Sequence, residues 1–396
     1  MELNENLLQK IKYLLRNSKI LIIYNSNSSR QKMAVYLLRS TYYTTTDLAD
    51  PAIRQRAIWQ PVEFIQGFTK PFMLLNIQYA PQLIEHLCSD VRRQPCIAVA
   101  SQCYYIKEAC KNLTGVEFIE LPLNVTEDKQ PFLPVESNMK AFIDADKDNG
   151  AVFERIVNGD LAGEKFENIS KRDSFYTGYI QRLLQYDIKS LTPVSDEMKF
   201  YRFMCAAAAC VGTVVNYAAL ANGADVSSPT AKQWLAYLEG AGVITLLYPV
   251  EAAGIKRLAK APKLYFADTG LACYLLRLAT ANDVEASTFA GNLFENWAYM
   301  QIKNSYLQNG LKPDFGYYRD SNAKEVSILI KHNGCLYPVE LRKEPLSVKK
   351  LQKKLKLLEV FEKQGELRIG SGCMVSLVRS SQQLDAGLWL VAASQL

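Results

Sequence analysis

A chain of 396 residues is too long for one ordinary domain, so two or three domains are expected. Its composition, 49% hydrophobic and 22% charged, is typical of a globular protein, and no apolar run reaches the roughly 18 residues that span a bilayer. The net charge of +6 permits nucleic-acid binding without indicating it. The nine cysteines form no CxxC pair, and the two histidines lie far apart, which argues against a zinc site or a histidine-based triad.

The first residues, MELNENLLQKIKYLL, predict an amphipathic helix and lack the small-residue cleavage site of a secretory signal. We therefore expect a cytoplasmic protein with no membrane partner. Strand-like and helix-like segments then alternate, which is typical of a parallel sheet covered by helices on both faces. The predicted strands are residues 20–24, 42–46, 71–76, 96–100 and 116–121, and the predicted helices are residues 31–39, 51–65, 81–91 and 104–113.

The middle of the chain is predicted to be an irregular connection with short helices over residues 124–170. Firm helices are predicted over residues 174–192 and 203–212. A helix–turn–helix pattern follows, with helices over residues 216–224 and 229–242. Ser228 is placed as the N-cap of the second helix, before Pro229. Residues 243–250 can form the strand of a wing.

The last hundred residues predict a small mixed α/β unit. The order of elements fits either a nuclease-like sheet or an unrelated mixed sheet. The predicted helices are residues 292–309 and 348–363, and the predicted strands are residues 315–319, 325–330, 335–341 and 372–378.

Three long stretches carry a resemblance to a known family. They are KRLAKAPKLYFADTGLACYLL (residues 256–276), GNLFENWAYMQIKNSY (residues 291–306) and YYRDSNAKEVSILI (residues 317–330). Together they resemble the bacterial and archaeal AAA+ ATPases that carry a C-terminal domain of unknown function. For such proteins ATP hydrolysis is expected, and the appended domains suggest a role at DNA.

The resemblance implies four regions in an α/β chain. They are a P-loop-NTPase-like AAA+ domain with a parallel sheet in residues 1–125, a helical, lid-like connection in residues 126–198, a winged-helix-like segment in residues 199–280 and a restriction-endonuclease-like α/β domain in residues 281–396.

The phosphate-binding loop that the resemblance implies is degenerate. Residues 19–38 have its strand–loop–helix pattern but not GxxxxGK[ST], whose glycines, lysine and hydroxyl hold phosphates and magnesium. Gln31 replaces the lysine, and Lys32 replaces the hydroxyl. Lys32 is one residue late, which on a helix is about 100° around the axis. The loop residues are Asn25, Ser26, Asn27, Ser28, Ser29, Arg30, Gln31 and Lys32.

Other nucleotide-site positions are also altered. Leu75 and Asn76 stand where the resemblance implies an acidic pair for magnesium and water, and Val116 and Tyr186 replace two arginines. Losing three or four charged hydrogen bonds, each worth roughly 1.5–3 kcal/mol, weakens binding by about 5–10 kcal/mol. No cofactor is therefore expected, and ATP with Mg²⁺ enters only if the degenerate loop still binds it. The positions that match the family are Gln78, Ser101, Gln102 and Asp187.

The restriction-endonuclease-like region has a second degraded site. The resemblance implies carboxylates at Glu295, position 327 and Glu340, and a lysine at position 342. Ser327 and Arg342 stand at two of these positions, and arginine cannot act as a general base. Glu325 shares a strand face with Ser327 and is a candidate ligand. No metal is expected if nearby cations satisfy the glutamates, and the candidate cations are Arg319, Lys324, Arg342 and Lys343.

Candidate nucleic-acid residues are Lys232, Gln233, Lys256, Arg257, Lys260 and Lys263, on and after the helix–turn–helix. A further basic run at residues 349–356 either contacts phosphates or is a solvated helix face. We predict a catalytically impaired AAA+ homologue that binds or scaffolds, with duplex DNA or another protein as partner. The alternatives are a working ATP-dependent enzyme acting on DNA and a metal-dependent nuclease that uses the surviving Glu295, Glu325 and Glu340.

Overall fold

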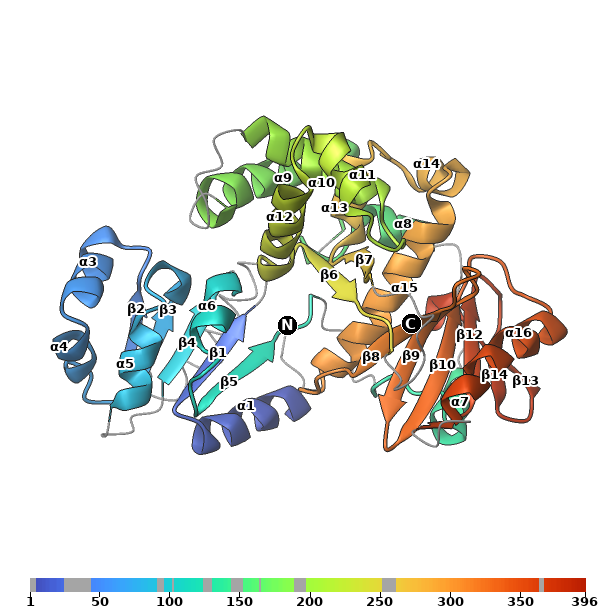
Figure 1. The fold of residues 1–396 in the computed structure, drawn as a ribbon, viewed down its shortest axis with the longest axis horizontal. Coiled ribbons are helices and arrows are strands. Elements are labelled where there is room, and N and C mark those ends of the chain that lie inside the picture. Colours follow the sequence, from blue (N-terminus) through green and yellow to red (C-terminus); the bar gives the residue numbers. More distant parts are fainter. Residues whose placement is uncertain are drawn as a thin grey trace.

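The computed structural model describes residues 5–24, 44–90, 96–101, 103–123, 130–143, 152–163, 165–188, 197–250, 261–362 and 367–396. The chain is mixed α/β, with a parallel sheet in its N-terminal part, a helical middle and a mixed sheet at its C-terminus (Figure 1). Within these ranges, no helix combines the length and the apolar character required to cross a bilayer.

The N-terminal sheet has five parallel strands in the order β2-β3-β4-β1-β5. The connection that leaves β1 runs to β2 on one side of it, and the connection from β4 runs to β5 on its other side. Open α/β sheets bind ligands at the carboxyl edge of such a point, where the connections diverge. The strands are β1 (Ile20–Tyr24), β2 (Thr44–Asp47), β3 (Phe72–Leu75), β4 (Cys96–Ala100) and β5 (Val116–Glu120).

Helices cover both faces of this sheet, as the sequence predicts. The amphipathic α1 (Glu5–Asn17) buries Leu7 and Ile11 against one face. The other face is covered by α3 (Pro51–Trp59), α4 (Pro61–Gln66), α5 (Leu83–Ser89) and α6 (Tyr104–Ala109), and a 3-10 turn (Ile77–Tyr79) follows β3.

Two predictions for this region need comment. The single helix expected over residues 51–65 is two helices, because Gln60 leaves the helical conformation before Pro61. The helix expected over residues 31–39 lies outside the described residues.

The middle of the chain is helical and ends in a two-stranded hairpin. The strand expected as a wing is β6 (Ile244–Leu247), which pairs antiparallel with β7 (Lys263–Phe266). The helices are α7 (Glu136–Ile143), α8 (Val152–Asn158), α9 (Ile169–Arg182) with a π-helical extension (Leu183–Ile188), α10 (Glu197–Ala209), α11 (Tyr217–Ala224) and α12 (Ser228–Gly240).

The expected helix–turn–helix pair is α11 and α12, but the predicted N-cap is wrong. Ser227, not Ser228, holds the extended conformation of a cap, and its side chain accepts a hydrogen bond from the backbone N–H of Thr230 at 3.2 Å. Ser228 and Pro229 are therefore the first two residues of the helix. The reach of the cap oxygen to the third helical N–H fixes this register.

The C-terminal sheet is mixed and has the order β13-β14-β12-β10-β9-β8, with β11 paired to β10. Its strands are β8 (Phe315–Arg319), β9 (Glu325–His332), β10 (Cys335–Leu341), β11 (Arg368–Ile369), β12 (Gly372–Ser376), β13 (Gln382–Asp385) and β14 (Leu388–Ala392). Its helices and those before it are α13 (Thr269–Leu275), α14 (Ala281–Ala286), α15 (Ala290–Leu307), α16 (Val348–Leu355), α17 (Glu359–Glu362) and 3-10 turns at Lys356–Leu358 and Ala393–Gln395.

Helix α15 crosses the molecule between the helical middle and the C-terminal sheet (Figure 1). Of its 18 residues, 15 are buried, and several of these are polar. One apolar core reaches from Leu123 to Leu396 and includes both faces of α15. The helical middle and the C-terminal sheet therefore share a core.

The sequence FADTG before α13 has a structural role in this core. Asp268, 3% exposed, caps α13 through Leu271 N–H at 2.7 Å and accepts two further hydrogen bonds, from Asp160 and Leu161 N–H at 2.6 and 2.8 Å. Gly270 is required because a Cβ there would lie 2.1 Å from the Tyr176 hydroxyl. This contact joins the end of α8 to the start of α13.

Asp268 holds its proton to a higher pH than an ordinary carboxyl group. Burial raises its pKa to about 6, although the hydrogen bonds from Leu271, Tyr176 and Asp160 oppose that shift. The Tyr176 hydroxyl lies 2.8 Å from both Asp268 Oδ1 and the Asn158 carbonyl. The hydroxyl has one proton for these two acceptors, so it donates to one of them at a time.

We expect stability to fall as pH rises through the folded-state pKa of Asp268. Below the ordinary value of 3.8 both states are protonated; between 3.8 and about 6 the unfolded chain ionises first, so the free energy of unfolding falls. The shift corresponds to roughly 3 kcal/mol. The neutral variant Asp268→Asn should flatten this part of the profile in urea unfolding at pH 4.5 and 7. An unchanged difference between the two pH values would show that Asp268 is ionised throughout.

Candidate functional site

The carboxyl edge of the N-terminal sheet carries a chain of hydrogen bonds among polar side chains. Asn76 follows β3 in a left-handed conformation and donates to Asp47 at 2.7 Å. Gln78 donates to Asn76 at 3.2 Å and to Ser101 at 2.8 Å. Leu75 is half-buried and packs on the α1 side of the sheet. Amides thus join the ends of three strands at the place where the resemblance implies two acids.

Asp47 is the carboxylate of this edge that sequence reasoning missed. It follows the predicted second strand, residues 42–46, and forms the last position of β2. The degenerate loop, Asn25 to Lys32, lies outside the described residues, as do Gln102 and the side chains of Tyr186 and Asp187.

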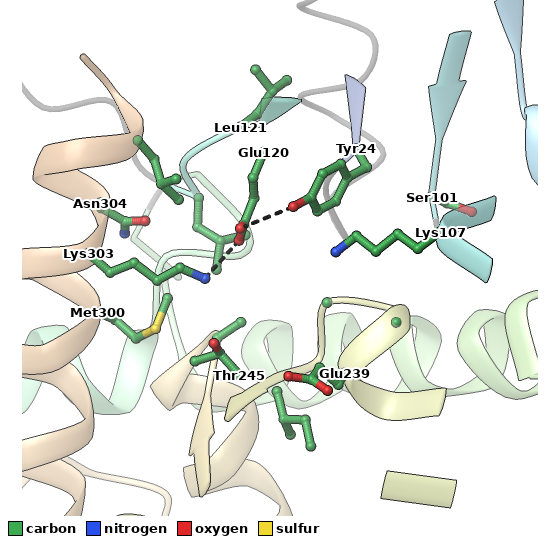
Figure 2. Close-up of a pocket in the computed structure, with 16 residues that line it drawn as sticks. Tyr24, Ser101, Lys107, Glu120, Leu121, Glu239, Thr245, Met300, Lys303 and Asn304 are labelled. Atoms are coloured by element: carbon green, nitrogen blue, oxygen red, sulfur yellow. Dashed lines mark hydrogen bonds and ion pairs between the residues drawn. The ribbon is translucent and has the colours of Figure 1, made fainter. Parts of the chain in front are cut away.

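A cavity of about 110 Å³ lies where this edge meets the rest of the molecule (Figure 2). We call it the junction cavity. The Cys103 N–H donates to the carbonyl of Gly240 at 2.9 Å and docks the end of α12 on α6. The lining residues are Tyr24, Ser101, Lys107, Glu120, Leu121, Leu123, Glu239, Gly240, Gly242, Ile244, Thr245, Ala267, Met300, Lys303, Asn304 and Leu307.

Opposite charges meet in the junction cavity. Lys303 of α15 lies 2.8 Å from Glu120 at the end of β5, and the Tyr24 hydroxyl lies 3.5 Å from the same carboxylate (Figure 2). Burial lowers the pKa of Lys303, but Glu120 and its neighbours outweigh that effect and raise it overall. Burial raises the pKa of Glu239, with Lys107 opposing the shift. The ion pair thus ties the N-terminal sheet to α15.

The predicted nucleic-acid helix is partly covered. Lys232 and Gln233 are exposed. Tyr237, one turn further on α12, is 1% exposed, accepts a hydrogen bond from Gln233 at 2.6 Å and packs edge-on against Tyr104 with ring centroids 5.2 Å apart. Only the first half of α12 therefore faces solvent. The candidates Lys256, Arg257 and Lys260 lie outside the described residues.

Lys263, predicted as a nucleic-acid contact, is buried, so that prediction is wrong. Its side chain is 1% exposed, and its ammonium contacts both Glu295 of α15 and Glu325 of β9, the latter at 2.7 Å. The Tyr265 hydroxyl donates to Glu295 at 2.7 Å, and Arg319 contacts Glu325 at 3.3 Å. The lysine ammonium thus lies between two of the carboxylates proposed as metal ligands.

Lys263 stays protonated in this position. Burial alone lowers the pKa of a lysine, but the carboxylates of Glu295 and Glu325 reverse that effect and raise it. A permanent ammonium between two carboxylates neutralises most of the charge that would attract a divalent cation.

The third carboxylate, Glu340 of β10, has its own cation. Its side chain is 1% exposed and contacts the ammonium of Lys354, while Arg342 lies 3.9 Å away. Burial raises the pKa of Glu340, and Lys354 opposes that shift. Ser327 Oγ accepts from the N–H of Leu341 at 3.2 Å and so occupies the position of the missing acid with a structural hydrogen bond.

Sequence reasoning anticipated Arg319 and Arg342 as partners of these glutamates and missed Lys263 and Lys354. A signal for Lys354 exists, because it lies three residues after the buried Leu351 and therefore near the inner face of α16. No such signal marks Lys263, since its partners come from distant segments. Among the described residues, no group of three His, Cys, Asp or Glu side chains is arranged to hold a metal.

Comparisons with known proteins match two regions of the chain. A domain of unknown function, DUF8612, matches residues 164–282, and a domain of unknown function, DUF4143, matches residues 290–396. The boundary between the two matches falls just before α15. Each matched segment is therefore similar to a recurring domain whose activity its description leaves open.

Two curated relatives are similar to part of the chain. They are the uncharacterized proteins Rv2008c of Mycobacterium tuberculosis and Mb2031c of Mycobacterium bovis, each 28% identical over 166 residues, which is 42% of this chain and 37% of the relative. The chain thus matches little more than a third of their length. Protein VC1899 from Vibrio cholerae aligns over 95% of both chains at 12% identity, but its TM-score of 0.19 is too low to indicate a shared fold.

Removing the cation between Glu295 and Glu325 should destabilise the folded protein. Lys263→Met leaves two partly buried carboxylates without their shared partner, and we expect the free energy of unfolding to fall by about 3–5 kcal/mol. The control Lys165→Met removes an exposed ion pair with Glu154 and should cost at most about 1 kcal/mol. Urea unfolding of both variants measures the difference. Equal losses would mean that the buried cation is not what stabilises the carboxylates.

Proposed function

We propose that this chain is a non-catalytic binding protein built on the layout of an AAA+ ATPase with winged-helix-like and restriction-endonuclease-like regions. The observation that carries the proposal is the ammonium of Lys263, held between Glu295 and Glu325. A nuclease needs such carboxylates free to bind a metal ion that activates water. Here a lysine of the chain itself satisfies them, and Lys354 satisfies Glu340.

The N-terminal sheet supports the same reading. Its strand order fits the P-loop layout that the sequence resemblance implies. Phosphoryl transfer depends on a bound metal and a residue that positions the nucleophile. The amides of Asn76 and Gln78 instead hydrogen-bond with Asp47 and Ser101. Such an edge supports packing or ligand binding rather than ATP hydrolysis.

Mg·ATP provides the direct test of impaired ATPase function. We expect a large excess of Mg·ATP to leave the melting temperature unchanged and to release no phosphate above the buffer rate. The charged groups that would bind the nucleotide and hydrolyse it are missing. Differential scanning fluorimetry and a phosphate-release assay measure the two outcomes. A melting shift with phosphate release that depends on Mg²⁺ would identify a working ATPase and refute the proposal.

For the partner, we favour duplex DNA over another protein because of a lysine stripe along α16 and the start of the 3-10 turn that follows it. The stripe is formed by four exposed lysines, and their ammonium groups have no ion pair among the described residues. Leu351, on the opposite side of α16, packs against β12 and β14, so the apolar side of the helix is already used. A basic surface without an exposed apolar face suits a phosphate backbone. The residues are Lys349, Lys350, Lys353 and Lys356.

Charge reversal on this stripe should weaken DNA binding. The double variant Lys349→Glu/Lys353→Glu should lower affinity for any duplex sequence and reduce the slope of log K against log salt by about 2. The control Lys140→Glu/Lys171→Glu makes the same change in net charge at two exposed lysines elsewhere. Fluorescence anisotropy with a labelled duplex measures both. If both doubles lose affinity equally, the stripe is a solvated face and the binding is non-local.

A further inference from the structure

The junction cavity contains a polar side chain without a partner. Asn304 of α15 is 5% exposed, and neither its Nδ2 nor its Oδ1 has a hydrogen-bond partner among the described residues. Figure 2 places Asn304 beside Lys303 among the residues that line the cavity. A buried polar group that is not hydrogen-bonded costs about 1–3 kcal/mol. A molecule bound in the cavity would offset this cost if it formed hydrogen bonds with the Asn304 amide.

A second buried asparagine on the same helix shows the normal arrangement. Asn296 is fully buried, accepts a hydrogen bond from Phe266 N–H at 2.7 Å and donates one to Phe266 C=O at 2.8 Å. Both of its polar atoms are satisfied by the backbone N–H and C=O of one residue of β7. Asn304 lies two turns further along α15, beside the cavity, and its amide has no such partner among the described residues.

The cavity has the size and the lining of a small-ligand site. Its volume of about 110 Å³ approaches the roughly 150 Å³ of an engineered apolar cavity that holds benzene. Leu121, Met300 and Leu307 form an apolar part of the wall. The polar part includes Asn304 and the charged side chains of Lys107, Glu120, Glu239 and Lys303. Ligand pockets combine an apolar lining with a few polar groups that fix orientation.

A wider groove of about 590 Å³ adjoins the cavity and shares Lys107, Glu120 and Lys303 with it. It is also lined by Lys10 and Lys312 and by the acid Glu117. Four lysines thus face two glutamates along the groove. Since Lys303 and Glu120 pair with each other, the excess charge is positive and suits an anionic substituent.

We propose that the junction cavity binds a small molecule with an amide-type edge, an N–H donor beside a carbonyl acceptor, and an anionic tail in the adjoining groove. The edge complements the free donor and acceptor of Asn304 as Phe266 complements Asn296. Because the walls come from the N-terminal sheet, from the α12–β6 segment and from α15, the bound molecule fastens these three parts together. The inference depends on the cavity alone and stands whether or not the chain binds DNA or ATP.

Matched pairs of probes test the amide edge in isothermal titration calorimetry. Succinamate carries a primary carboxamide and an anionic tail, and succinate replaces its amide by a carboxylate. Uridine 5′-monophosphate carries a cyclic lactam, and N3-methyluridine 5′-monophosphate blocks its N–H. We expect at least one amide probe to bind about tenfold or more tighter than its control. Succinamate alone identifies a carboxamide ligand and the uridine nucleotide alone a nucleobase; no preference in either pair overturns the proposal.

Two leucine variants extend the test. Asn304→Leu removes the unpaired amide and should abolish the preference for the amide probe while leaving the melting temperature equal or higher. Asn296→Leu leaves the Phe266 peptide unpaired and should lower the melting temperature. Persistence of the probe preference in Asn304→Leu overturns the proposal. If Asn304→Leu does not fold, the matched probes on the unaltered chain still decide.

Discussion

The structure depends on the burial of a helix that is too polar to be buried without partners. Helix α15 lies inside the molecule along nearly its whole length. It carries Asn296, Lys303 and Asn304 into the interior, and Glu295 is partly buried. Each charge or amide taken out of water is costly unless a partner replaces the lost hydration. Lys303 finds its partner in the N-terminal sheet and Asn296 in the hairpin, while Glu295 shares Lys263 with a glutamate of the C-terminal sheet. The helix therefore fixes how these three parts are joined.

This constraint accounts for the state of the second site. Glu295 of α15 is partly buried, and a carboxylate that is largely withdrawn from water needs a cation. Either a bound metal ion or an ammonium group can supply the charge. Lys263, on the hairpin strand β7, supplies it here and links α15 to β9 through Glu325. The same side chains that would serve catalysis in an open site thus serve cohesion, which is consistent with a protein that binds rather than reacts.

Much of the fold follows from the sequence, and the reasons are local. The strands over residues 20–24, 96–100, 315–319 and 335–341 are observed with the predicted bounds, because short apolar or alternating runs end at turn residues there. Strand β14, LWLVA, is fully buried but was not predicted, since a short apolar run gives no periodicity that separates strand from helix. Ser227 and Ser228 are both good caps, and only the structure shows which one reaches Thr230.

The site was less predictable than the fold because its pairings are not local. The surviving and missing acids could be identified from the chain, as could Arg319 near Glu325. Lys263 could not be paired from sequence, because 32 residues separate it from Glu295 and 62 from Glu325. That the Asn304 amide has no hydrogen-bond partner among the described residues likewise depends on packing. An asparagine in a helical sequence gives no indication of what surrounds it.

Crystals soaked in manganese and recorded at its absorption edge test the central claim most directly. We predict that no anomalous peak appears between Glu295 and Glu325, and that the Lys263 ammonium remains within hydrogen-bonding distance of both. A manganese peak in coordination contact with these carboxylates, with Lys263 displaced, would show that the chain retains a metal centre and would contradict the account.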